Sequence, residues 1–383
     1  RAAVYVLEPL SEDELGQLLD RALAAGAPQL ALSAEARATL IAYADGDRRS
    51  QAWSLQDLAW VTTTRGDFAG ANEALGRAAR TFAELGDPVG RAWLRGTTAF
   101  VRLLSGRLAQ TRRLARVFLP FGERSGEAWA VGTLRAVAAF ASAELGELAE
   151  ADGEARHAYR DFAAAGDDWG RGLSLVVRGV VARGLGEYLH AYDLLSDATV
   201  CAEHTRHPLL LGMARTMRGF VCIDLGDLAA AEADAVAVLE AVEPHAVLDA
   251  AQVGPLTLLS MARRAKGDID GAVELLAPVA AAPLDAPSLV FARRHAVAAY
   301  ASALLAAGRL AEAVTVATTA TVTTGEDVRS EVYAWQTLAK TLVAAGRMAE
   351  ARVAADTAVR VAYGTQQVSE RASADRVRAT VED

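Results

Sequence analysis

The side chains best suited to nucleophilic catalysis lie close together in the sequence, between residues 174 and 196. Ser174 and Ser196 carry hydroxyls, and His190 and Asp193 are three positions apart, so these two share a face if the segment is helical. A serine nucleophile also needs a strained turn of the Gly-x-Ser-x-Gly kind, and neither serine lies in one. We therefore interpret His190 and Asp193 as surface residues and expect that the chain is not an enzyme.

The sequence contains no convincing motif for binding a metal or a nucleotide. Cys201 and Cys222 lack the spacing of a disulfide framework or a zinc site, and the pair His204 and His207 has only Glu203 beside it, on a predicted helix end. No Gly-x-x-x-x-Gly-Lys-Ser/Thr loop occurs, so the sequence lacks the phosphate-binding loop that would hold a nucleoside triphosphate and its Mg²⁺. We expect neither a metal nor a cofactor.

Arginine is the charged side chain that the sequence offers most often for recognition, because only Lys266 and Lys340 among the 39 basic residues are lysines. A ridge of guanidiniums along predicted helices could clamp the carboxylates of a partner. The candidates are Arg95, Arg135, Arg178, Arg215 and Arg218. The alternative is that they are ion-paired or solvated beside acids such as Glu144, Glu154 and Asp224.

Aromatic side chains recur at related positions of the same predicted helices. They predict an apolar groove that receives a hydrophobic segment of a protein or peptide partner. The alternative is that they form the core between packed helices, since helical spacing alone places aromatic residues in cores. The candidates are Trp60, Trp93, Phe100, Phe140 and Phe220.

The elements that carry these side chains are set by a glycine that recurs at intervals of 40, 40, 40, 40, 41, 41 and 38 residues. Glycine ends a helix readily because it adopts the left-handed conformation at little cost. Small residues lie seven positions before and five positions after each glycine, which lets two antiparallel helices approach closely. The glycines are Gly66, Gly106, Gly146, Gly186, Gly226, Gly267, Gly308 and Gly346.

This arrangement resembles the tetratricopeptide repeat. The likeness is carried by stretches such as AWVTTTRGDFAGANEAL (59–75) and GFVCIDLGDLAAAEADAV (219–236), and covers roughly residues 50–365. It implies an all-α, right-handed α-solenoid of about eight helical hairpins that binds a protein or peptide and catalyses nothing. The period exceeds the usual ~34 residues, so the helices or linkers must be longer. Such longer repeats are similar to the sensory arms of bacterial signalling ATPases and transcription regulators.

The first fifty residues differ from the rest. A short apolar stretch from Val4 to Leu7 is followed by a capping box of Ser11 with Glu14 and an amphipathic pattern, and a second predicted helix precedes Gly46-Asp47-Arg48-Arg49. Together these features resemble the lid of an AAA+ ATPase of the replication-associated recombination and clamp-loader group. The resemblance implies that Arg1 reaches the nucleotide of a neighbouring subunit and that Arg49 senses a nucleotide. We expect a lid-like segment over 1–50, a repeat array over 51–365 and a C-terminal cap over 366–383. Two origins remain open, the tail of a natural signalling ATPase or a junction of unrelated segments, and the alternative function is that of an ATPase subunit.

Charge and hydropathy limit the partners further. The net charge is −9 and the pI is about 5.3, which argues against a general nucleic-acid surface or an anionic membrane surface. The sequence shows no signal peptide and no apolar run of transmembrane length. We expect a cytoplasmic protein that recognises a protein or peptide.

Overall fold

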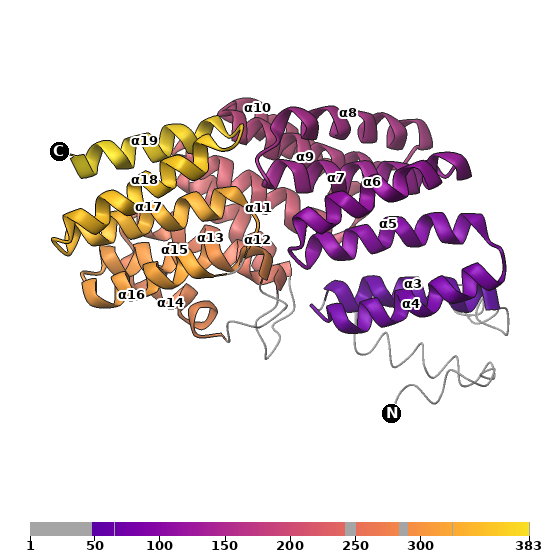
Figure 1. Cartoon of the computed structure of the whole chain (residues 1–383), viewed down its shortest axis with the longest axis horizontal. Helices are drawn as coiled ribbons and strands as arrows, with labels where there is room; N and C mark the ends of the chain where they lie inside the picture. Colours follow the sequence, from indigo (N-terminus) through magenta and orange to yellow (C-terminus); the bar gives the residue numbers. More distant parts are fainter. Residues whose placement is uncertain (1–47, 65, 242–249, 283–289, 324, 383) are drawn as a thin grey trace.

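The computed structural model describes residues 48–64, 66–241, 250–282, 290–323 and 325–382, and every regular element in these ranges is an α-helix. The helices follow one another as antiparallel hairpins (Figure 1). The first four hairpins are α3 (Arg48–Thr64) with α4 (Phe68–Glu84), α5 (Pro88–Leu104) with α6 (Leu108–Ser125), α7 (Ala128–Glu144) with α8 (Leu148–Ala165), and α9 (Asp168–Leu185) with α10 (Tyr188–Thr205).

Four more hairpins and a final helix complete the described chain. They are α11 (Pro208–Leu225) with α12 (Leu228–Ala241), α13 (Ala250–Ala265) with α14 (Ile269–Ala281), α15 (Val290–Ala306) with α16 (Leu310–Val322), and α17 (Val328–Ala344) with α18 (Met348–Tyr363), followed by α19 (Val368–Glu382). The all-α array of about eight helical hairpins predicted from the sequence is confirmed. None of the helices in the described ranges is long and apolar enough to cross a membrane.

Each predicted glycine ends the first helix of its hairpin with a positive φ, from 70° to 91°. The connections between the first four hairpins end in the same way, at Gly86, Gly126 and Gly166. After α10 the position is occupied by Arg206, with φ of 51°, the one residue other than glycine with positive φ in the described part of the chain. A tight turn every 20 residues therefore leaves helices of 17 or 18 residues in this half, which accounts for the long period.

The small residues around the turns lie at the closest helix–helix contacts, as predicted. All eight residues five positions after the turn glycines are 0 % exposed: Ala71, Thr111, Ala151, Ala191, Ala231, Ala272, Ala313 and Ala351. Before the turns, a Cβ on Gly179 would lie 2.5 Å from Cγ of Leu195, and one on Gly219 would lie 2.2 Å from Cδ2 of Leu258. Larger side chains would push the paired helices apart.

Ala151→Leu is expected to lower the free energy of unfolding by about 1–3 kcal/mol, because α7 and α8 leave no room for the extra atoms. Gly153→Ala on the same helix is the matched control, since nothing lies within 4 Å of the added Cβ. It should stabilise the chain by about 0.5–1 kcal/mol, through helix propensity alone. Urea denaturation measures both, and a harmless Ala151→Leu would contradict the close contact.

The hairpins stack in two layers. The first helices of successive hairpins contact one another, from α3 on α5 through to α17 on α19, whereas the second helices pack mainly on the first. The first helices therefore form the inner layer of a superhelix. The stack also returns on itself, because α19 packs against α9 as well as α17 (Figure 1).

Hydrogen bonds between residues 217 positions apart mark this closing seam. Helices α6 and α8 begin without a side-chain cap of their own. Glu326 accepts the N–H of Ala109 at 2.6 Å, and Gln366 accepts the N–H of Ala149 at 2.8 Å. Late residues thus satisfy helix N–H groups that would otherwise lack a partner. Gln366 also donates its own N–H to the carbonyl of Gly146 at 2.9 Å.

The segment boundaries expected near residues 50 and 366 can be compared with the helix bounds. Helix α3 begins at Arg48, so the boundary drawn after residue 50 falls inside its first turn. The remainder of the lid-like segment, residues 1–47, lies outside the described residues. Helix α19 occupies most of the segment expected to be a C-terminal cap, and its buried residues, among them Glu370, Val377 and Val381, pack against the array.

Candidate ligand-binding site

The predicted aromatic column lies mostly inside the stack. Phe100, Phe140 and Phe220 are 1 %, 2 % and 7 % exposed, so the expectation of an open row of rings is wrong for these three. The inner helices pack too tightly to leave the rings in solvent. Trp60 and Trp93 are half-buried, and Trp60 lies 4.6 Å from Phe100 between ring centroids.

Tryptophans connect the early hairpins along the inner layer. Trp93 lies between Trp53, at 5.6 Å, and Trp129, on which it stacks at 4.1 Å between centroids. Trp129 is in turn 6.2 Å from Trp169. These edge-on and stacked contacts add to the apolar burial and stiffen the first half of the array. Of these four tryptophans, only Trp93 was among the predicted groove residues.

The candidate arginines do not form a ridge of free guanidiniums. Arg135 binds Asp161 at 2.5 Å and Glu123 at 3.0 Å, and Arg218 makes two hydrogen bonds to Asp234, at 2.9 and 2.6 Å. For these residues the ion-paired alternative holds.

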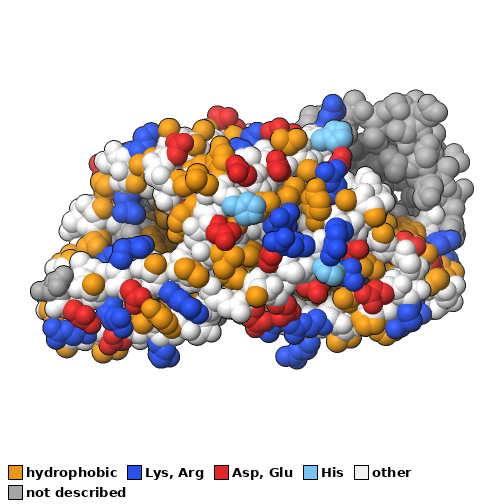
Figure 2. All heavy atoms as spheres, turned by 90° about the horizontal axis from the view of Figure 1, so that it is seen from above, with side chains coloured by type: hydrophobic (Ala, Val, Ile, Leu, Met, Phe, Trp, Pro, Cys, Tyr) orange, Lys and Arg blue, Asp and Glu red, His pale blue; other side chains and the backbone are white. Residues whose placement is uncertain are grey.

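The remaining three arginines have separate surroundings. Arg215 binds Glu203 at 2.9 Å, and the guanidinium of Arg95 lies 4.2 Å from the ring centroid of Phe121. Arg178 is half-buried. On the face in Figure 2, basic and acidic side chains alternate among apolar ones.

Only one of the two arginines predicted to have a nucleotide role lies in the described part of the chain. Arg1 lies outside the described residues. Arg49 lies in the first turn of α3, where its Nε is 2.7 Å from a carboxylate oxygen of Asp87. This ion pair ties the first hairpin to the second, and a nucleotide role for Arg1 and Arg49 stays a prediction.

The residues considered for catalysis are not brought together. Ser174 is buried and donates its hydroxyl to the carbonyl of Gly170 at 2.9 Å, whereas His190 and Asp193 are exposed and share no hydrogen bond within the described ranges. Burial raises the pKa of the Cys222 thiol to about 11, so the thiol is protonated at neutral pH. Ser196 is half-buried.

The histidines considered as ligands each have another role. Nδ1 of His204 lies 2.8 Å from a carboxylate oxygen of Asp168. His207 caps α11, accepting the N–H of Leu210 at 3.4 Å. In the part of the chain that the structure covers, no three metal-binding side chains are grouped.

A central cavity of about 890 Å³ lies within the superhelix. Its walls come mainly from the inner helices and are largely apolar, with side chains from both halves of the array facing one another. The apolar lining includes Trp60, Leu104, Phe140, Val180, Met213, Met217, Phe220 and Val253. The volume is in the upper part of the range for ligand pockets, ~300–1,000 Å³.

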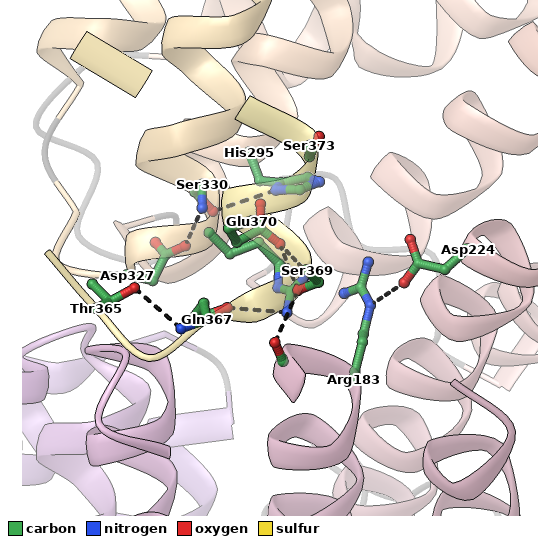
Figure 3. Close-up of polar contacts among 12 residues, drawn as sticks. Arg183, Asp224, His295, Asp327, Ser330, Thr365, Gln367, Ser369, Glu370 and Ser373 are labelled. Atoms are coloured by element: carbon green, nitrogen blue, oxygen red, sulfur yellow. Dashed lines mark hydrogen bonds and ion pairs between the residues drawn. The ribbon is translucent and has the colours of Figure 1, made fainter. Parts of the chain in front are cut away.

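Charged side chains line the cavity in two places. Glu203, Arg206 and Arg215 lie around the connection from α10 to α11, and a second group gathers at the end where α19 closes the seam. Figure 3 shows Arg183 of α9 pointing to Asp224 of α11, with the two side chains 2.5 Å apart. Arg329 of α17 binds Glu370 of α19 and also donates a hydrogen bond to Oε1 of Gln367 at 3.2 Å. These residues come from four hairpins or helices distant in sequence.

Burial shifts the titration of the groups that line this end. It raises the pKa of the Glu144 carboxyl to about 7, helped by the charge of Asp327 and opposed by Arg329 and Arg183. Burial also raises the pKa of Asp327, against the hydrogen bond from Ser330. It lowers the pKa of His295 to about 3, with Arg183 and Arg329 acting in the same direction.

Four sequence candidates, Trp60, Phe140, Arg215 and Phe220, line this cavity, but sequence reasoning missed its polar end. Glu144 entered only as a possible partner of arginines, and Arg183, Asp327 and Arg329 were not singled out. His295 does occupy the register of Trp53, Trp93 and Met213, thirteen positions before a turn glycine, which is the one signal that could have pointed here.

Comparison with known proteins agrees with the fold. No protein-family model and no curated protein matches the sequence. Among solved structures, the Cut9–Hcn1 hetero-tetramer of the APC/C aligns with a TM-score of 0.54 and 13% identity, over 97% of this chain and 66% of its own. A Rap protein complexed with competence and sporulation factor aligns with a TM-score of 0.53 and 10% identity, over 86% and 97%. The chain has a tetratricopeptide-like repeat fold.

A third similar structure, a signal-transduction ATPase with a tetratricopeptide repeat sensor from Pyrococcus horikoshii, covers 99% of this chain and 50% of its own at 14% identity. Its TM-score of 0.39 carries no argument about an ATPase. The tetratricopeptide-like fold therefore accounts for the scaffold, and the function has to be argued from the cavity.

Proposed function

We propose that the chain is a non-catalytic binding scaffold that holds an elongated apolar ligand or peptide segment in its central cavity. The observation that carries this proposal is the cavity itself, a space of about 890 Å³ with largely apolar walls and a small number of polar and charged groups. Sites for small ligands have this composition, because the walls supply affinity and the polar groups supply orientation.

The closed superhelix supports the same proposal. A ligand inside it would touch hairpins from both halves, so binding would favour the closed form over more open ones. The similar Rap protein was solved in complex with competence and sporulation factor, which supports a bound partner for a scaffold of this shape. We propose that the array is the sensory or interaction arm of a larger signalling protein and passes the change in shape to its partner.

Filling the cavity tests this function. Met213→Trp enlarges a half-buried side chain of the lining, and Val353→Trp makes a similar change at an exposed site on α18. Peptides selected from a displayed library by the unaltered chain should lose binding at least tenfold with Met213→Trp, about 1.4 kcal/mol, and keep it with Val353→Trp. If the selected peptides bind the unaltered chain, Met213→Trp and Val353→Trp equally well, the cavity is not their binding site.

A further inference from the structure

The ion pairs at the polar end of the cavity leave carboxylates in excess. Three guanidiniums lie at or beside this end, and each has its own acidic partner. The pairs are Arg183 with Asp224, Arg329 with Glu370, and Arg294 with Glu331. Two further carboxylates that line the cavity, those of Glu144 and Asp327, form no salt bridge with a described residue. The charges of Arg183 and Arg329 still act on Glu144, and the charge of Arg294 acts on Asp327.

The surroundings of Glu144 and Asp327 show that they are available to a ligand. Glu144 makes no hydrogen bond or ion pair with another residue in the ranges that the structure describes. Asp327 uses one oxygen to cap α17, accepting the N–H of Ser330 at 2.8 Å. The two carboxylates are near enough for Asp327 to affect the titration of Glu144, so a cation between them would be attracted by both.

His295 supplies a second, separate observation. Its Nε2 is buried and has no hydrogen-bond partner among the described residues, while Nδ1 lies 3.4 Å from the hydroxyl of Ser330. A buried polar atom without a partner is costly, and a bound ligand would relieve that cost. At neutral pH the imidazole is uncharged, because its pKa is lowered to about 3, so it adds no positive charge that would repel a cation.

We propose that the ligand of this cavity carries a protonated amine on an apolar body, and that Glu144 and Asp327 bind the ammonium while the apolar walls bind the rest. The inference rests on the proposed function, since it names the chemical class of the ligand. The ammonium belongs either to the amino terminus of a peptide or to a small alkylamine. Both present the same group to the carboxylates.

The same geometry makes binding depend on pH. Glu144 is faced by Asp327 and Arg329 from the α17 end, by Arg183 from α9 and by Glu370 from α19. With the cavity empty, its raised pKa leaves part of the population protonated at neutral pH. An ammonium binds the ionised carboxylate better than the protonated one. The affinity for an ammonium ligand should therefore be highest above pH 7 and fall as the pH drops below 7. Binding at pH 7 should release protons.

Matched probes with one apolar chain test the charge. We would titrate the full chain with decylammonium, decanol and decanoate, below their micelle concentrations, by calorimetry at pH 8 and pH 6. Decylammonium should bind about tenfold more tightly than decanol at pH 8, and decanoate should bind most weakly. The advantage of decylammonium should shrink at pH 6, and the heat at pH 7 should vary with the ionisation enthalpy of the buffer.

Two variants assign the effect to the cavity. Glu144→Gln keeps the shape and removes the charge, so it should lower decylammonium affinity about tenfold and leave decanol affinity unchanged. Glu350→Gln is the control, because Glu350 is exposed on α18 and pairs with Arg347. An apolar pentapeptide with a free or an acetylated amino terminus distinguishes a peptide ligand from an alkylamine.

The outcomes separate this inference from the proposed function. Equal affinity for the three probes, or an unchanged decylammonium affinity in Glu144→Gln, overturns the inference and leaves the cavity as a binding site for apolar ligands. If no probe and neither peptide binds the unaltered chain, the inference and the proposed function are both overturned.

Discussion

Phe162→Ala is expected to lower the free energy of unfolding by about 3–5 kcal/mol, as for other large side chains removed from a core. The ring is 0 % exposed between α7, α8 and α9. The ring packs directly against two glycines that leave room for it. A Cβ on Gly132 would lie 2.7 Å from the ring, and a Cβ on Gly170 would lie 2.1 Å from it. Urea denaturation followed by circular dichroism measures the loss.

A double-mutant cycle makes this prediction specific. Gly170→Ala alone should destabilise the chain, because the new methyl meets the ring, but it should cost much less in the Phe162→Ala background, where the space is empty. Phe121→Ala is the control, as this ring is 41% exposed on α6. Additive effects of the two substitutions would show that Phe162 and Gly170 are not in contact.

The repeat could be predicted because its signals are local. A helix end with positive φ selects glycine, and a close helix crossing selects alanine, so both leave a mark at a fixed distance in the sequence. Gly66 and Ala71 illustrate this, as do the equivalent residues of the later hairpins. The exception is Arg206, where the same backbone conformation occurs without its usual residue.

The aromatic column shows where a periodic pattern is ambiguous. Phe100 and Phe140 lie on the predicted inner helices, yet the neighbouring hairpins cover them. Periodicity identifies the helix face that a residue occupies but not the distance to the next hairpin. That distance depends on the curvature of the whole stack.

The polar end of the cavity could not be predicted because it depends on contacts across the seam. Glu326 and Ala109 are 217 positions apart, and within their own hairpins they are an ordinary acid and an ordinary alanine. Glu144 likewise becomes unusual only when α17 and α19 bring further charges to it. A single sequence does not record how many hairpins complete one turn, so it does not show which residues meet there.

Glu370→Ala tests the seam and is expected to cost about 3–5 kcal/mol, because it leaves the guanidinium of Arg329 buried without its carboxylate. The two side chains are 9% and 15% exposed, so solvent screens them little. Ser369 beside it donates to the carbonyl of Gly184 at 3.2 Å, so a displaced α19 would also lose its contact with α9. Hydrogen exchange should show lower protection of α19, and denaturation gives the total.

The control for Glu370→Ala is Glu350→Ala, which removes a carboxylate from an exposed pair with Arg347 and should leave the free energy of unfolding nearly unchanged, because solvent screens that pair. Equal losses in the two variants would mean that burial does not distinguish the pairs. A local loss of protection in α19 has a further consequence, because α17 and α19 supply part of the polar end of the cavity. Decanol, which does not use the carboxylates, should then also bind Glu370→Ala more weakly, and an unchanged decanol affinity would show that the cavity does not need the closed seam.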